Sequence, residues 1–212
     1  MGNIPPKPER PFSMLTFIYA VLTCVMLAVV AFNEYYQRKM KVSPMPTPQS
    51  TRKAMLNCIH QKSPKVIAEL GSGWGGIALA AAARYPQAKI IGFEGSLIPL
   101  LFSKMRLLLH PEIKNVTFEN KNFFESDMQD IDVVLCYLSN PHMSQLEPKL
   151  DHELKCGAEI VSSTFYMPHW RAREKTTVGG LYDTDIYIYE KTEAPLPQSL
   201  APPAAAAAAA AA

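Results

Sequence analysis

The feature that most restricts the fold of this chain is an apolar segment that runs directly into a cluster of glycines. Residues 66–70 read Val-Ile-Ala-Glu-Leu, which is typical of a buried strand, and Gly71, Gly73 and Gly75 follow. Glycine lacks a Cβ, so it permits positive φ angles and lets a ligand approach the backbone closely. An ordinary strand-to-helix turn is the alternative explanation. The pattern predicts a strand, a ligand-binding turn and then a helix.

Two acidic residues near this turn indicate which ligand it binds. Glu69 closes the first strand, and Glu94 follows a second predicted strand, residues 89–93, where a doubly wound sheet places the acid that binds a ribose hydroxyl pair. Gly76 also completes a Gly-x-Gly-x-x-Gly spacing, so the glycines alone allow a nicotinamide cofactor. A carboxylate at Glu69 would repel a pyrophosphate but can bind the ammonium group of S-adenosylmethionine. We therefore expect S-adenosylmethionine as the cofactor.

Residues 12–32 form an uncharged, apolar segment of the length needed to cross a hydrocarbon core as a helix. We interpret it as a transmembrane helix that contacts the lipid bilayer. A cleaved signal peptide is the alternative, because residues 29–31 read Val-Val-Ala, like a cleavage site. The basic residues after the segment outnumber those before it, which predicts a single-pass membrane protein whose C-terminal domain faces the cytoplasm or the mitochondrial matrix.

With 212 residues, the chain has room for one globular domain besides this segment. The net charge is +2 and the basic residues are scattered, so we expect no nucleic acid partner. The four cysteines lack a Cys-x-x-Cys pairing, so we expect neither a metal site nor a disulfide framework, but buried thiols in a reducing compartment.

Predicted strands and helices alternate along the globular part. The expected helices cover residues 50–61, 75–84, 96–110 and 143–155, and Ser50 and Thr51 are expected to cap the first of them. The expected strands cover residues 65–69, 89–93, 115–119, 132–138, 158–164 and 185–189. This alternation predicts an α/β fold with a parallel sheet, helices on both faces and a ligand at the carboxyl ends of the strands.

Several segments resemble a known family. The Glu69-x-Gly-x-Gly-x-Gly turn resembles motif I of the class I S-adenosylmethionine-dependent methyltransferases. Residues 133–138, 141–150, 153–158 and especially 165–170, Phe-Tyr-Met-Pro-His-Trp, resemble the small membrane-anchored protein lysine methyltransferases of the ATP synthase c-subunit and adenine nucleotide translocase type. The resemblance spans roughly residues 50–190 and implies a Rossmann-like class I methyltransferase sheet, preceded by one N-terminal transmembrane helix.

We accordingly divide the chain into five parts. They are a polar N-terminal tail at 1–11, the transmembrane helix at 12–32, a Pro-rich linker at 33–49, a methyltransferase-like domain at 50–192, and a Pro- and Ala-rich tail at 193–212 that we expect to be disordered or unassigned.

The resemblance also implies cofactor-binding residues. Glu69, Gly71, Gly73 and Gly75 would hold the methionine end of S-adenosylmethionine, and Glu94 its ribose. Asn122 stands where the family has an aspartate that contacts the adenine amino group. An amide oxygen can still accept a hydrogen bond, but this departure predicts weaker binding or lost activity.

Methyl transfer to lysine is an in-line displacement that needs a neutral amine, a desolvated pocket and correct positioning. Aromatic walls would orient the amine and the cationic product. The loops after the fourth and fifth strands supply candidates for this wall: Tyr137, Asn140, His142, Phe165, His169 and Trp170. We select Tyr137, Asn140, His169 and Trp170 as catalytic candidates, with no metal. The alternatives are that Phe165 and Trp170 only cover the sheet, that His169 caps a turn, and that His142 starts a helix.

These features predict a membrane-tethered, S-adenosylmethionine-dependent protein lysine N-methyltransferase that acts on membrane proteins. Two alternatives remain open. One is a non-catalytic subunit of a larger membrane complex that keeps the methyltransferase fold, since fold alone does not determine function. The other is a methyltransferase for a lipid or quinone, although the chain lacks a large lid or extra domain to enclose such a substrate.

Overall fold

The computed structural model of the chain describes residues 14–40, 47–179 and 183–193. It contains two compact units, residues 1–41 and 42–212, which we describe separately. The predictions for residues 1–11, for residues 41–46 of the linker and for residues 194–212 fall outside the described residues.

The described residues of the first unit form one long helix, α1 (Met14–Met40). Residues Met14–Ala31 have a mean hydropathy of 2.5, so the helix is long and apolar enough to cross a membrane, as an N-terminal signal sequence also is. The Thr23 hydroxyl donates to the Tyr19 carbonyl at 2.8 Å, which satisfies this polar group within the helix as a hydrocarbon environment requires. The helix continues beyond residue 32, where we expected the linker to begin, because the next proline is Pro44.

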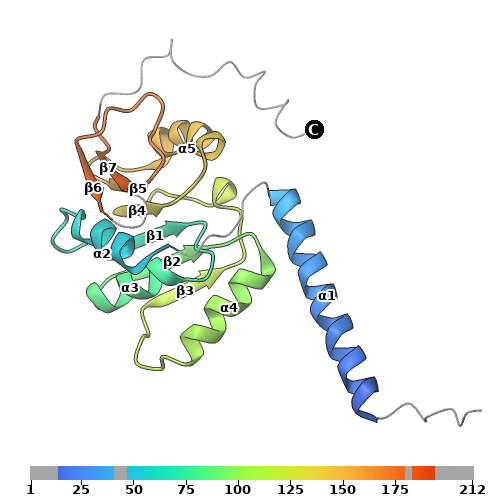
Figure 1. The fold of residues 1–212 in the computed structure, drawn as a ribbon. Helices are drawn as coiled ribbons and strands as arrows, with labels where there is room; N and C mark the ends of the chain where they lie inside the picture. The colour runs from blue at the N-terminus through green and yellow to red at the C-terminus, as the bar shows by residue number, and fades with distance from the viewer. Residues whose placement is uncertain (1–13, 41–46, 180–182, 194–212) are drawn as a thin grey trace, which may run out of the picture. The chain divides into compact units, whose positions relative to one another are not determined.

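The second unit is built on a seven-stranded sheet with the order β3-β2-β1-β4-β5-β7-β6 (Figure 1). Its strands are β1 (Val66–Leu70), β2 (Lys89–Phe93), β3 (Val116–Glu119), β4 (Val133–Cys136), β5 (Glu159–Ser163), β6 (Glu174–Val178) and β7 (Thr184–Glu190). The α/β fold is confirmed. The predicted parallel sheet is found in β1 to β5, whereas β7 runs antiparallel to both β5 and β6. β6 was not predicted because it is an edge strand without buried residues and so lacks an apolar pattern.

Helices cover both faces of the sheet, as predicted (Figure 1). They are α2 (Gln49–Asn57), α3 (Gly76–Arg84), α4 (Leu97–Leu108) and α5 (Asn140–Glu153), with a short 3₁₀ helix, η1 (Phe123–Glu125). Two of the helices begin at other residues than predicted, and α2 ends at Asn57 rather than near residue 61. Pro48, rather than Ser50 or Thr51, precedes the first turn of α2, and α5 begins at Asn140 with Pro141 in its first turn, where proline fits a helix start.

Alternate residues of the strands belong to two separate hydrophobic cores. Ile67 and Val133 pack with α2, α3 and α4 on one face, whereas Ala68 and Val134 pack with α5 on the other. This is the period-two alternation expected of a strand that is buried on both faces. Among the four cysteines only Cys136 is buried, so the prediction of four buried thiols is wrong.

The order of the strands places a topological switch point beside β1. The chain proceeds from β1 outward to β2 and β3, and then crosses back to β4 on the other side of β1. The loops that leave the carboxyl ends of β1 and β4 therefore run to opposite faces of the sheet. Ligands of open α/β sheets bind at such a switch point.

Candidate functional site

The turn after β1 has the backbone conformation that its glycines predict. Gly71, Gly73 and Gly75 have φ angles of 73°, 50° and 73°, a region that residues with a Cβ rarely adopt. A Cβ added at Gly75 would lie 2.7 Å from the Phe118 ring, so glycine is required there for packing. A Cβ added at Gly73 would meet nothing within 4 Å. The turn is therefore tightly packed beneath Gly75 and open at Gly73, as a cradle for a ligand requires.

Glu94 connects this turn to the start of α4. The residue follows β2 and is 8% exposed, and its carboxylate accepts hydrogen bonds from the backbone N–H groups of Gly73 and Ser96, each at 2.7 Å. A carboxylate has about four acceptor positions. The remaining positions let Glu94 accept hydrogen bonds from ligand hydroxyl groups while it holds the turn in place.

Glu69 is buried beneath the turn. Its Oε2 accepts a 2.7 Å hydrogen bond from the backbone N–H of Ala78, in the first turn of α3. Burial raises the pKa of Glu69 to about 8; the Ala78 hydrogen bond and the Arg52 charge act in the opposite direction, and the Glu94 charge adds to the rise. Glu69 is consequently protonated in the free protein at neutral pH, and a cationic ligand beside it would favour its ionised form.

The turn also contains a buried polar atom that needs a partner. Among the buried side-chain oxygen and nitrogen atoms of the described residues, one has no hydrogen-bond partner: Ser72 Oγ. Such groups are costly, and they occur where a ligand or a water binds. The open side at Gly73, the carboxylate of Glu94 and this hydroxyl together fit a polar, adenosine-type cofactor.

Asn122 caps η1, on the loop that follows β3. Its Oδ1 accepts from the backbone N–H of Phe124 at 3.1 Å, and its Nδ2 donates to Glu125 at 3.0 Å. The amide oxygen therefore already has one partner in the protein and retains one lone pair for a second donor.

Tyr137 and Phe165 come together at the carboxyl edge of the sheet. Tyr137 follows β4 directly, Phe165 lies two residues beyond β5, and their rings stack with centroids 6.1 Å apart and an interplanar angle of 24°. Leu138, next to Tyr137, would touch a Cβ added at Gly71 at 3.1 Å. The loop that carries Tyr137 thus passes beside the glycine turn through Leu138.

Asn140 and His142 lie in the first turn of α5 at the same edge. His142 shares a 2.7 Å hydrogen bond with the Ser139 hydroxyl and stacks on Phe124 of η1, with ring centroids 6.2 Å apart. Partial burial lowers the pKa of His142, so its imidazole is neutral at neutral pH. Asn140 is exposed.

A buried acid that sequence reasoning missed holds His169 and Trp170. Glu147 of α5 is 0% exposed, and its carboxylate accepts from the backbone N–H groups of His169 at 2.8 Å and Trp170 at 2.5 Å. His169 Nδ1 also lies 2.8 Å from Glu147 Oε2. The available signal was an acid between Leu146 and Leu150 on the apolar face of a predicted helix.

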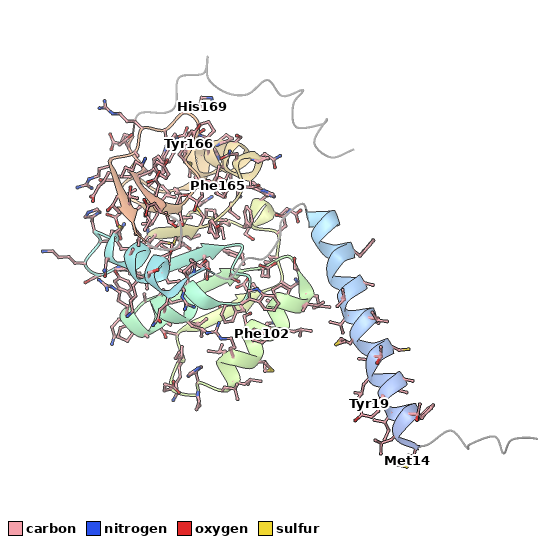
Figure 2. All side chains as sticks on the ribbon, viewed as in Figure 1. Met14, Tyr19, Phe102, Phe165, Tyr166 and His169 are labelled. Atoms are coloured by element: carbon pink, nitrogen blue, oxygen red, sulfur yellow. The ribbon has the colours of Figure 1, made fainter. Side chains whose placement is uncertain are left out.

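The Trp170 side chain does not share the edge where Tyr137 and Phe165 meet. Its ring packs against Tyr189, with centroids 6.3 Å apart, and the Lys191 ammonium lies 5.8 Å from the ring centre. Tyr189 pairs with Ile160, near the amino end of β5. The segment after β5, on which Figure 2 labels Phe165, Tyr166 and His169, therefore leaves the carboxyl edge and passes along α5, where Glu147 binds the His169 backbone. Among the described residues, no group of His, Cys, Asp and Glu is suited to bind a metal.

Comparison with known proteins agrees with this geometry. The model of the family described as the ANTKMT methyltransferase domain matches residues 69–174, from Glu69 to the start of β6. An RNA methyltransferase from Salinibacter ruber, solved in complex with S-adenosyl-L-homocysteine, superimposes with a TM-score of 0.65 at 28% identity, covering 73% of this chain and 97% of that one.

Two curated proteins are similar in sequence. A protein-lysine N-methyltransferase of Saccharolobus islandicus is 29% identical over 151 residues, which cover 68% of this chain and 91% of that protein. The lysine N-methyltransferase of the ATP synthase c-subunit from Rattus norvegicus is 29% identical over 121 residues, 57% of this chain and 54% of the rat protein. The chain therefore matches about half the length of the rat enzyme.

The matched region contains the glycine turn, Glu94, Asn122 and the loops after β4 and β5, and the Salinibacter enzyme binds the product form of S-adenosylmethionine. The chain belongs to the ANTKMT methyltransferase domain family and is an S-adenosylmethionine-dependent methyltransferase.

Proposed function

We propose that this chain is a membrane-tethered protein-lysine N-methyltransferase whose targets are membrane proteins. The observation that carries the proposal is the stacked Tyr137–Phe165 pair, whose members follow β4 and β5 at the same sheet edge as the open glycine turn that follows β1. The names of the Saccharolobus and rat relatives support lysine as the acceptor.

The cofactor-binding residues are those on and below the turn. Gly71, Gly73 and Gly75 shape the cradle, Glu69 interacts with the ammonium group at the methionine end, and Glu94 accepts hydrogen bonds from the ribose hydroxyls. Asn122 accepts a hydrogen bond from the adenine amino group through its second lone pair. When bound, S-adenosylmethionine supplies the methyl group for the transfer.

The residues at the carboxyl edge orient the lysine. Tyr137 and Phe165 contact its aliphatic stem and exclude water, which favours the neutral amine that the displacement needs. Asn140 offers an amide oxygen for the amine. The neutral His142 is a titratable group at this edge that can take up a proton, either directly or through water. His169 and Trp170, through Glu147, hold the segment that carries Phe165.

The apolar helix α1 limits the choice of targets. A domain tethered to a membrane encounters lysines near the bilayer surface at a greatly increased effective concentration. We therefore expect its targets among the proteins of the same membrane, with the methyltransferase domain on the cytoplasmic or matrix side.

A labelling experiment tests this function. Membranes from a strain that lacks the protein are incubated with the full chain and S-adenosylmethionine carrying a deuterated methyl group, and labelled lysines are mapped by mass spectrometry. We expect labelled lysines in integral membrane proteins. With S-adenosylmethionine below saturation, Glu94→Ala should reduce the label by roughly tenfold or more, because losing hydrogen bonds to a charged acceptor weakens cofactor binding by about that factor. The exposed Glu193→Gln should label normally.

The alternative of a non-catalytic subunit makes a different prediction. Asn122, whose oxygen already caps η1, favours that alternative. A folded chain that binds no S-adenosylmethionine in calorimetry and labels no lysine would refute the proposal and support the non-catalytic role. Label confined to soluble proteins would refute only the membrane-protein targets.

A further inference from the structure

The outward face of α4 is apolar. Its large hydrophobic side chains are exposed, and Leu108 reaches 83% exposure. We define the α4 apolar face as Leu97, Leu101, Phe102, Met105 and Leu108 together with Leu109, the residue after the helix. Successive helix residues are rotated by about 100°, so these positions project from one side. Figure 2 labels Phe102 on this helix, near the β3 edge of the sheet.

A helix on the surface of a soluble domain normally exposes polar side chains, whereas α4 exposes apolar ones. Leu100 and Ser103 already bury the inner side of α4 in the core, so the outer side should be polar. The helix instead contains only two charged residues, Lys104 and Arg106, both basic, and no acid. An apolar face bordered by cations is typical of a helix that lies in the interface of a membrane with anionic lipids.

The α4 apolar face is continuous with the cofactor cradle. Trp74, in the glycine turn, packs edge-on against Phe102 with ring centroids 5.2 Å apart. Arg106 Nη1 donates to the Trp74 carbonyl at 2.8 Å. α4 also begins three residues after Glu94, whose carboxylate binds the Ser96 N–H. A surface that contacts this face therefore lies beside the edge at which the lysine is methylated.

The short connection between α1 and α2 favours a bilayer as the surface that contacts the α4 apolar face. Only eight residues, 41–48, separate the end of α1 from the start of α2. An extended chain spans at most about 3.6 Å per residue, so this connection reaches roughly 30 Å. If α1 spans a bilayer, the methyltransferase domain stays within a few tens of ångströms of its surface.

We propose that the α4 apolar face inserts into the interfacial region of the bilayer in which α1 is anchored, and that this contact orients the cofactor cradle toward membrane-embedded substrates. This inference rests on the membrane tether of the proposed function. Lys104 and Arg106 contact anionic headgroups, while the leucines and Phe102 enter the region of the acyl-chain carbonyls.

Lipid cross-linking tests this contact. The full chain is reconstituted into vesicles of phosphatidylcholine and phosphatidylglycerol that include a phosphatidylcholine with a photoactivatable diazirine near the acyl-chain carbonyl. After irradiation, lipid adducts are mapped by mass spectrometry. We expect adducts on residues 14–31 and on residues 97–109, but none on the peptide that contains Tyr166, which is 56% exposed but lies on the segment after β5.

A matched pair of variants supplies the control. Leu101→Gln combined with Leu108→Gln changes only exposed side chains and should reduce adducts on residues 97–109 by roughly tenfold or more, because it removes apolar burial in the interface. Adducts on residues 14–31 should persist. Tyr166→Gln should leave both sets unchanged.

The possible failures are distinguishable. Adducts on residues 14–31 without adducts on residues 97–109 in the unmodified chain would overturn this inference and leave the tether intact; the face would then be covered by a protein partner, a second copy or α1. Adducts on residues 97–109 alone would show that the α4 apolar face contacts lipid but would contradict the tether, and so would overturn the inference as stated. Adducts on neither segment would refute both.

Discussion

Replacing Glu69 with glutamine should change the pH dependence of the stability of the methyltransferase domain. Burial raises the pKa of Glu69 from its ordinary value of 4.5 to about 8 in the folded protein. The folded domain therefore keeps this proton up to about pH 8, whereas the unfolded chain releases it near pH 4.5. The contribution of Glu69 to stability is thus fully present below the unfolded-state value and is lost as pH rises through the folded-state value.

The size of the effect follows from the shift. Between these two pKa values, the free energy of unfolding should fall by about 1.4 kcal/mol for each pH unit. From pH 5 to pH 7 the loss amounts to about 3 kcal/mol. Glutamine resembles the protonated acid in shape, and its oxygen can still accept the hydrogen bond from Ala78. Glu69→Gln should remove the pH-dependent loss without removing this bond.

Urea unfolding of residues 44–200 at several pH values measures the effect. The stability of Glu69→Gln relative to the unmodified domain should increase by about 3 kcal/mol from pH 5 to pH 7. The exposed Glu193→Gln should give a nearly constant difference. If the Glu69→Gln difference is also constant over this range, Glu69 is ionised in the free protein and the reasoning is wrong.

In calorimetry, S-adenosylmethionine should bind to the unmodified domain with release of a proton at pH 7, and to Glu69→Gln without it.

Four further outcomes are expected. Gly75→Ala should destabilise the domain by about 1–3 kcal/mol in thermal unfolding, because the added Cβ would lie 2.7 Å from Phe118. Gly73→Arg places its side chain in open space, so the domain should still fold, at a cost of about 1–2 kcal/mol. The same variant should abolish S-adenosylmethionine binding in calorimetry. Glu147→Leu should cost about 3 kcal/mol or more in urea unfolding, since two backbone N–H groups lose their acceptor. Asn122→Asp combined with Glu125→Gln, which avoids two adjacent carboxylates, should still cap η1 and tighten S-adenosylmethionine binding by roughly tenfold, because hydrogen bonds to a charged acceptor are stronger. Unchanged affinity would show that this side chain does not contact the cofactor.

Features that depend on neighbouring residues could be read from the sequence. The strand at Lys89–Phe93 has the predicted bounds, and the positive φ angles of Gly71, Gly73 and Gly75 follow from the absence of a Cβ. The apolar run of α1 predicted its helix, since length and composition alone make it suitable for a membrane. The place of Glu94 beside the turn also followed, because parallel strands bring their carboxyl ends to one edge.

Features that depend on distant residues required the tertiary structure. β6 is a strand only because β7 pairs with it, and nothing in its own residues is apolar enough to predict it. Trp170 follows Phe165 by five residues, yet the buried carboxylate of Glu147 holds its backbone and its ring packs against Tyr189, away from the aromatic pair.

The same distinction applies to charge and exposure. The sequence by itself determined that an acid precedes the glycines and that a leucine-rich helix follows Glu94. Only the fold decided that Glu69 is buried, which raises its pKa, and that the leucines of α4 point outward rather than into the core. Local patterns specify backbone conformation, whereas desolvation depends on which parts of the chain pack around a side chain, and those parts are far away in sequence.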